Sequence, residues 1–217
     1  LKTSNYDERA ELQNNVVFLE LWYFLNAKEF DRLLGIERKV LDYFQEYDRK
    51  VNASARHLLC HNLSLFFWAR GELGEECPTP QEQREWNLGK ALDWNGEIIN
   101  DQRDEVRTEI RRLAYLLRAI LLYELQALDP AVNLLRSARR QFQSHNCLFD
   151  YERVVLRELK RIFESPSPAE AQVHFQDLRD ELKEIRKRAE GRRLPGLEEI
   201  EIWICSSLEN KPFRDCF

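Results

Sequence analysis

The sequence predicts an all-α protein whose helices follow one another in antiparallel pairs. Apolar residues recur three and four positions apart in about nine successive segments, which is the period of an amphipathic helix. The breaks between these segments are short and contain helix-capping residues. Alternating apolar and polar runs typical of strands are missing, and the glycines and prolines number only seven each. We therefore expect stacked helical hairpins and no sheet.

The stretch 113–135 is the most informative one. Its first sixteen or so positions are interrupted by only three polar side chains, Arg118, Glu124 and Gln126. A helix of this kind needs neighbours on several sides. The segment is shorter than the roughly 20 apolar residues that cross a bilayer, so we expect a buried helix. Asp129 and Pro130 then suit the N-cap and the first position of a second, amphipathic helix.

The remaining elements are expected to form one continuous domain over residues 1–217. Their predicted order is hairpin 1 (1–50), hairpin 2 (54–99), hairpin 3 (102–145), hairpin 4 (149–191), a C-terminal capping helix (197–209) and a tail (210–217). Pro212 cannot continue a helix and disfavours helix in the residue before it, so the tail is expected to be extended.

Each hairpin is supported by a local signal. The first helix of hairpin 1 offers a wide apolar face made of Val16, Val17, Phe18, Leu21, Trp22, Phe24 and Leu25, and Asp31 suits the cap of its return helix. In hairpin 2, Asn52 begins a helix that Gly71 ends. Capping boxes with proline at the first helical position start two later helices, at residues 79–82 and 167–170.

Composition limits the class of partner. The net charge of −5 arises from 38 acidic and 33 basic residues, so we expect no nucleic-acid and no membrane partner. Five cysteines at irregular spacings predict reduced thiols and a cytoplasmic location. The chain begins at Leu1 and contains no methionine, so we expect it to be a fragment of a longer chain.

One stretch resembles a known repeat. Residues 62–73 are similar to the first helix and turn of a tetratricopeptide repeat, through Ser64, Phe67, Trp68, Gly71, Glu72 and Leu73. Hairpin 3 follows the same scheme with Ala119, Leu122, Tyr123, Leu128 and Ala131, and hairpin 1 with Tyr23, Phe24, Phe30 and Leu33. The turns are spaced more widely than the regular repeat of about 34 residues. The whole chain also resembles uncharacterised bacterial helical-repeat proteins.

This resemblance implies a right-handed α-solenoid that binds a protein or peptide on its concave face, and it implies no chemistry. It places a set of side chains on that face, with packing between neighbouring repeats as the alternative role for each: Phe18, Trp22, His61, Leu65, Trp68, Ile120 and Tyr123. Arg118, inside an apolar helix, is expected either to be buried and paired or to line the same groove.

Other functions remain as alternatives. The chain could be a peptide-sensing regulatory domain that controls an effector domain upstream. His57 and His61 share a helix face next to Cys60 and could bind a metal, but the glutamate of a metalloprotease motif is replaced by Leu58. No catalytic motif is recognisable, so we expect a non-enzymatic scaffold with no cofactor and no bound metal. Its partner is a protein or peptide, and homo-oligomerisation is a further possibility.

Overall fold

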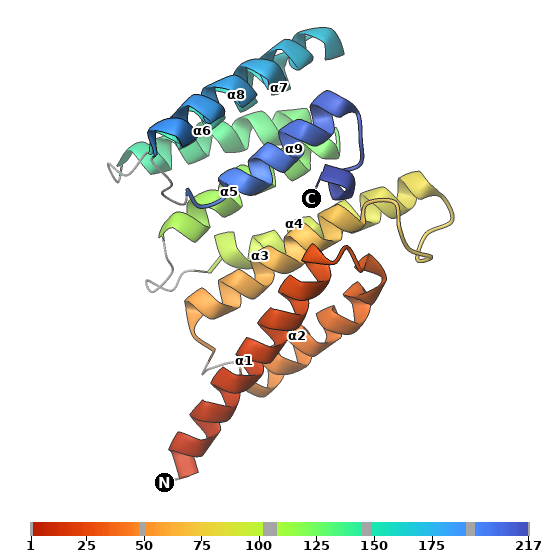
Figure 1. Ribbon diagram of the computed structural model, residues 1–217, viewed down its shortest axis with the longest axis vertical. Helices are drawn as coiled ribbons and strands as arrows, with labels where there is room; N and C mark the ends of the chain where they lie inside the picture. The colour runs from red at the N-terminus through yellow and green to blue at the C-terminus, as the bar shows by residue number, and fades with distance from the viewer. Residues whose placement is uncertain (1, 48–50, 102–107, 145–148, 190–193, 217) are drawn as a thin grey trace. The chain divides into compact units, whose positions relative to one another are not determined.

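The computed structural model describes five ranges of the chain, residues 2–47, 51–101, 108–144, 149–189 and 194–216 (Figure 1). All regular secondary structure in these ranges is helical, in nine α-helices and two short 3-10 helices, and no strand occurs in them. The prediction of an all-α chain is confirmed for this part. Contacts group the chain into two compact units, Leu1–Ile110 and Arg111–Phe217, where the sequence predicted one continuous domain.

Unit 1 is organised around its third helix. Its elements are α1 (Lys2–Asn26), the 3-10 helix η1 (Phe30–Arg32), α2 (Leu33–Tyr47), α3 (Ala53–Arg70) and α4 (Pro80–Ile99). Helix α3 packs against α1, α2 and α4. Every side chain from Leu63 to Arg70 is buried, so this helix has no exposed face in its second half.

Aromatic side chains join the helices of unit 1. Phe30 of η1 meets Phe66 of α3 edge to face, with ring centroids 5.5 Å apart. Trp94 of α4 lies 6.4 Å from the ring of Phe44 in α2, and its indole nitrogen donates to the Glu37 carboxylate at 3.0 Å. The hydrogen bond satisfies the polar edge of a nearly buried tryptophan.

The predicted caps of α3, α4 and α8 (Pro168–Arg188) are confirmed. The Asn52 side chain accepts a hydrogen bond from the Ser54 amide at 2.8 Å. Thr79 accepts from the Glu82 amide at 3.2 Å, and Ser167 accepts from the Glu170 amide at 3.3 Å. Gly71 ends α3 with φ of 54°, a conformation that glycine adopts without steric cost.

Buried polar side chains hold the irregular connection between α3 and α4. Asn87 of α4 donates to the carbonyls of Gly71 and Leu73, at 2.7 and 3.1 Å. Arg70, 5% exposed, pairs with Glu76 of the connection at 2.9 Å. These bonds satisfy loop carbonyls and a buried guanidinium that would be costly to leave unpaired.

Several helices of unit 2 pack around one tryptophan, Trp203. Its elements are most of α5 (Thr108–Glu124), then α6 (Leu128–Ser144), α7 (Asp150–Glu164), α8, α9 (Leu197–Glu209) and the 3-10 helix η2 (Phe213–Cys216). Trp203 of α9 is fully buried, edge to face with Phe175 of α8 and Tyr123 of α5. Its indole nitrogen donates to Glu124 at 2.8 Å, and Tyr123 in turn stacks on Phe163 of α7.

A buried ion pair links α5 to α7. Arg112 and Glu152 meet at 2.8 Å, with side chains only 5% and 2% exposed. Glu152 also accepts from the Phe149 amide at 3.1 Å, and its neighbour Tyr151 donates to the Pro195 carbonyl at 2.8 Å. Burial raises the pKa of Glu152 and outweighs the lowering by these donors. The start of α7 is thereby tied to both α5 and the turn before α9.

Two local predictions were wrong. Helix α6 begins at Leu128, because Gln126 turns the chain with φ of 59° and the Ala131 amide already donates to the Ala127 carbonyl. Asp129 and Pro130 therefore lie inside its first turn. The tail is not extended either, because Phe213 is buried within η2, which packs on α9. Gly191, the last residue of the predicted hairpin 4, lies outside the described residues.

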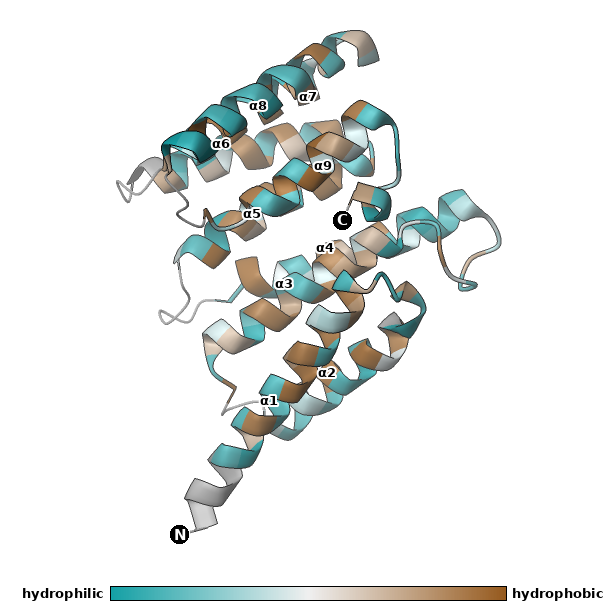
Figure 2. Cartoon of the chain, viewed as in Figure 1, coloured by the Kyte–Doolittle hydropathy of each residue, from teal (hydrophilic) through white to brown (hydrophobic). Residues whose placement is uncertain are grey.

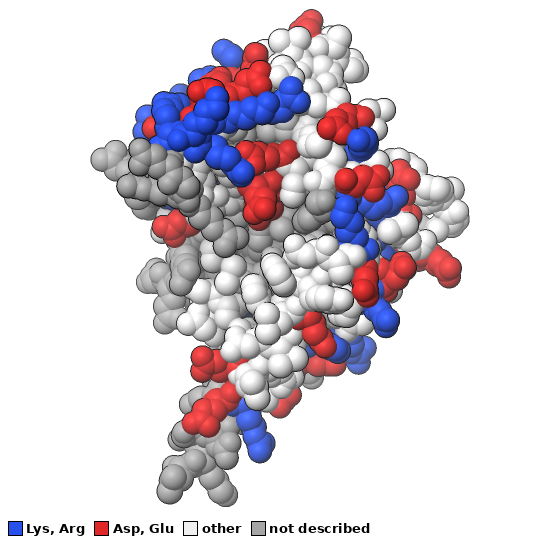
Figure 3. All heavy atoms as spheres, viewed as in Figure 1, with Lys and Arg blue, Asp and Glu red and all other residues white. Residues whose placement is uncertain are grey.

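The apolar residues of α8 recur four and three positions apart in the sequence, which predicts one apolar and one charged face, and the structure confirms this division. Its buried residues are Ala171, Phe175, Leu178, Leu182 and Ile185. The side of α8 turned toward the viewer in Figure 2 is hydrophilic, and charged groups of both signs gather over it in Figure 3. The sequence could predict the apolar face of α8 because neighbouring helices cover only one side of this helix.

Leu121→Ala should lower the free energy of unfolding by about 2–5 kcal/mol, because Leu121 is fully buried and alanine leaves a cavity. Leu122→Ala should cost less, since Leu122 is half-buried. Lys183→Ala on the exposed face of α8 should stay within about 0.5 kcal/mol, since its ion pair with Asp180 is solvated. Urea titrations would measure all three; equal midpoints for Leu121→Ala and Lys183→Ala would contradict this placement of the core.

Candidate functional site

Helix α1 is apolar on two opposite sides. One side is buried and consists of Ala10, Val17, Leu21 and Leu25. The opposite side remains exposed, and we call it the outer stripe: Leu12 (65% exposed), Val16 (49%), Leu19 (59%), Trp22 (53%) and Tyr23 (56%). Figure 2 shows hydrophobic residues along α1, and the surface over its middle in Figure 3 is mostly uncharged.

The outer stripe has the spacing of a helix-binding surface. Leu12, Val16, Leu19 and Tyr23 lie four, three and four residues apart, as the seam positions of a coiled coil do. Isolated exposed apolar side chains are ordinary, but a contiguous row of large ones marks an interaction site. This row is the largest such feature on α1.

An open groove of about 550 Å³ borders the stripe on the α2 side. Leu12, Val16, Val17 and Tyr47 contribute apolar surface to its lining. Lys39 of α2 pairs across it with Glu20 of α1 at 2.6 Å. The groove therefore combines apolar surface with a solvated ion pair, a composition suited to a peptide or helix and without any nucleophile–base pair.

The side chains predicted to form a concave binding face differ greatly in exposure. In unit 1, Trp22 is exposed and Phe18 is half-buried, both on α1. The three residues on α3 are buried: His61 (6% exposed), Leu65 (3%) and Trp68 (4%). These three belong to the core of the structure, since α3 packs against α1, α2 and α4.

The predicted residues of unit 2 also lie inward. Ile120 is 1% exposed. Tyr123 is half-buried in the aromatic cluster around Trp203, and burial raises the pKa of its hydroxyl. Arg118 is half-buried, an exposure intermediate between a buried, paired side chain and one that lines a groove. Trp22 is thus the one predicted residue that the described part of the chain presents openly to a partner.

The exposed residues Leu12, Leu19 and Tyr23 were missed as surface contacts, and Val16 was expected to face inward. The four-three-four spacing could have identified them. It was hidden because α1 also contains the apolar residues of its buried side, and a wide apolar face was the simpler interpretation of the two sets together.

His57 and His61 have separate environments. The His57 ring nitrogen Nε2 lies 2.8 Å from Asp101, and the side chain is fully buried. Cys60 between them is also buried, and burial raises its pKa to about 12, which disfavours the thiolate that a metal requires. Among the described residues, the one group of three close potential metal ligands lies elsewhere, at Glu158, His174 and Asp177.

In the described part of the chain, no helix is long and apolar enough to cross a membrane. Comparisons with known proteins add no relative: no protein-family profile matches the sequence, and no similar chain was found among the curated proteins or the solved structures.

Two tryptophans should respond oppositely to truncation. Trp68→Ala should destabilise the fold by about 3–5 kcal/mol, because it empties a buried site. Trp22→Ala removes an exposed ring and should change the free energy of unfolding by no more than about 0.5 kcal/mol. Chemical denaturation followed by circular dichroism would compare them; a stable Trp68→Ala protein would mean that Trp68 is available to a partner after all.

Proposed function

We propose that the chain is a non-enzymatic protein-binding module that holds an amphipathic helix of a partner protein against the outer stripe of α1. The observation behind this proposal is the row Leu12, Val16, Leu19 and Tyr23, exposed and spaced as a helix–helix seam. An amphipathic helix meets such a surface with its own apolar residues at three- and four-residue spacing. Trp22 beside the row supplies a large rigid side chain of the kind that dominates binding energy.

This proposal retains two expectations from the sequence, a tetratricopeptide-like solenoid and a protein or peptide partner. It moves the binding surface from the concave face to the outer stripe of α1. Consecutive helical pairs in each unit are compatible with a helical repeat. Binding on the inner face of α3 would require His61, Leu65 and Trp68 to leave the core, whereas binding on α1 requires no rearrangement. A preformed surface avoids that conformational cost.

We also propose that the protein resides in a reducing compartment such as the cytoplasm, where cysteine thiols stay reduced. Cys60, Cys77, Cys205 and Cys216 are free. Burial raises the pKa of Cys205 to about 12, and Cys216 and Glu209 beside it act in the same direction. Protonated thiols of this kind react slowly and serve packing rather than chemistry.

The experiment is an affinity capture with the chain, identification of the retained protein, and titration of that protein's helical segment. Leu19→Ala and Trp22→Ala should each weaken binding by at least about 1–2 kcal/mol, because they remove central apolar contacts. Leu41→Ala is the matched control: Leu41 is also an exposed leucine (47%), but it lies on α2 outside the stripe. It should leave the affinity unchanged.

Three results would contradict the proposal. Equal loss of binding in Leu41→Ala would show that the effect is not specific to the stripe. Loss in Glu184→Ala would place the contact on the charged face of α8. Concentration-dependent dimerisation of the wild-type chain that Leu19→Asp abolishes, seen by light scattering, would identify a second copy as the occupant in place of a different protein.

A further inference from the structure

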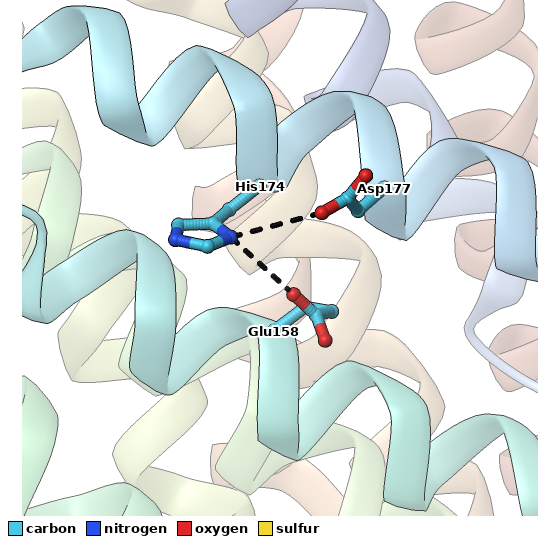
Figure 4. A group of neighbouring side chains, drawn as sticks. All are labelled: Glu158, His174 and Asp177. Atoms are coloured by element: carbon cyan, nitrogen blue, oxygen red, sulfur yellow. Dashed lines mark ion pairs between the residues drawn. The ribbon is translucent and has the colours of Figure 1, made fainter.

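A histidine and two carboxylates from two helices of unit 2 face one another (Figure 4). Glu158 is on α7, and His174 and Asp177 are on α8, where a separation of three residues puts both on one face. The His174 Nδ1 atom lies 3.8 Å from Glu158 Oε2 and 3.9 Å from Asp177 Oδ2. All three potential ligand atoms lie within 4.8 Å of one another. The α7–α8 packing creates this group, since the sequence separates its members.

Glu158 is the unusual member, because it is a fully buried carboxylate that uses only one oxygen for hydrogen bonds. Oε1 accepts from Arg157 Nε at 2.5 Å and from Arg161 Nη1 at 3.0 Å. Oε2 is buried and has no hydrogen-bond partner in the structure. Buried oxygens of charged groups are normally satisfied, so the open lone pairs of Oε2 need an explanation.

His174 also has a buried atom without a hydrogen bond, and this atom faces Glu158 Oε2. Its Nδ1 is buried and makes no hydrogen bond, although the side chain as a whole is 28% exposed. The 3.8 Å between Nδ1 and Oε2 is too long for a hydrogen bond. The two buried ligand atoms, His174 Nδ1 and Glu158 Oε2, therefore face each other without a hydrogen bond. Asp177, 53% exposed, lies beside them, with its Oδ2 atom 3.9 Å from Nδ1.

The donor set indicates which ion this space would suit. One imidazole nitrogen with two carboxylate oxygens is a zinc-type set, whereas calcium and magnesium take oxygen ligands almost alone. Bonds of about 2.0–2.2 Å in a tetrahedral site require ligand atoms roughly 3.3–3.5 Å apart. The two distances from His174, 3.8 and 3.9 Å, exceed this separation by a few tenths of an ångström, and the two carboxylate oxygens lie within 4.8 Å of each other.

The charges around the group permit a dication. Arg157 and Arg161 bind the opposite oxygen of Glu158 and fix its orientation, and Arg157 also pairs with Glu181. The three carboxylates of Glu158, Asp177 and Glu181 outnumber the two guanidinium groups. A dication would thus enter a site of net negative charge, and the arginines hold a ligand in place as outer partners do in metal centres.

We infer that Glu158, His174 and Asp177 form a binding site for a zinc-class divalent cation that clips α7 to α8. Nδ1 of His174, Oε2 of Glu158 and Oδ2 of Asp177 are the ligands, and the partial exposure of His174 and Asp177 leaves a fourth position open to water. The inference is independent of the α1 surface, which belongs to unit 1.

Zinc ion alone is the probe, titrated into the full chain after treatment with a chelator and removal of that chelator. Isothermal titration should show one zinc per chain, and the melting temperature should rise with zinc because the ion binds the folded state. His174→Ala and Asp177→Asn should each weaken zinc binding at least about tenfold and abolish the rise in melting temperature. Asp177→Asn separates metal binding from folding, because Asp177 is 53% exposed and its substitution should leave the fold intact.

Asp180→Asn is the matched control. Asp180 is an exposed carboxylate on the same helix, 59% exposed and paired with Lys183, and its removal should leave zinc binding unchanged. Absence of stoichiometric zinc binding by the wild-type chain would overturn the inference and leave His174 as a simple ion-pair partner of Glu158. Unchanged zinc affinity in both His174→Ala and Asp177→Asn would also overturn it, by placing the ion elsewhere.

Discussion

Helices that are apolar on nearly all sides must be covered on nearly all sides, and both units depend on this constraint. In unit 1 the constraint falls on α3, where every residue from Leu63 to Arg70 is buried. In unit 2 it falls on α5, whose Ala114, Leu116, Leu117, Ala119, Ile120 and Leu121 are all buried. The burial of apolar surface supplies the main driving force of folding, so the surrounding helices take their places around these two. The side chains of His61, Leu65 and Trp68 on α3 accordingly lie in the core.

Complete burial of a helix brings polar groups inside with it, and these groups define the connections. Arg70 at the end of α3 and Asn87 of α4 fix the α3–α4 connection through Glu76, Gly71 and Leu73. Arg112 near the start of α5 is paired with Glu152, which also caps the first turn of α7. Apolar packing alone tolerates sliding of one helix on another, whereas a buried pair is satisfied in one register only.

The candidate functional features lie on helices with a side that the core does not need. Helix α1 has four buried apolar residues on one side and a second row of apolar residues on the opposite side, which remains exposed. Helices α7 and α8 pack on each other through apolar residues, and at the edge of that contact Glu158 and His174 face each other with unsatisfied atoms. Neither feature improves the stability of the isolated chain, since exposed apolar surface and unsatisfied buried polar atoms are both costly. Such features are expected where a protein binds something.

The sequence by itself determined the all-α class, the succession of helices in the described residues, the caps at Asn52, Thr79 and Ser167, and the single apolar face of α8. These depend on residues within one or two turns of each other. Tertiary structure decided which side of α1 stays exposed, because α1 has apolar residues on two sides and its packing against α2 and α3 buries only one of them. It also decided that Trp68 is buried while Trp22 is exposed, and that Glu158 of one helix meets His174 of the next. These outcomes depend on packing between segments that are distant in the sequence. The periodicity of apolar residues within one helix contains no information about that packing.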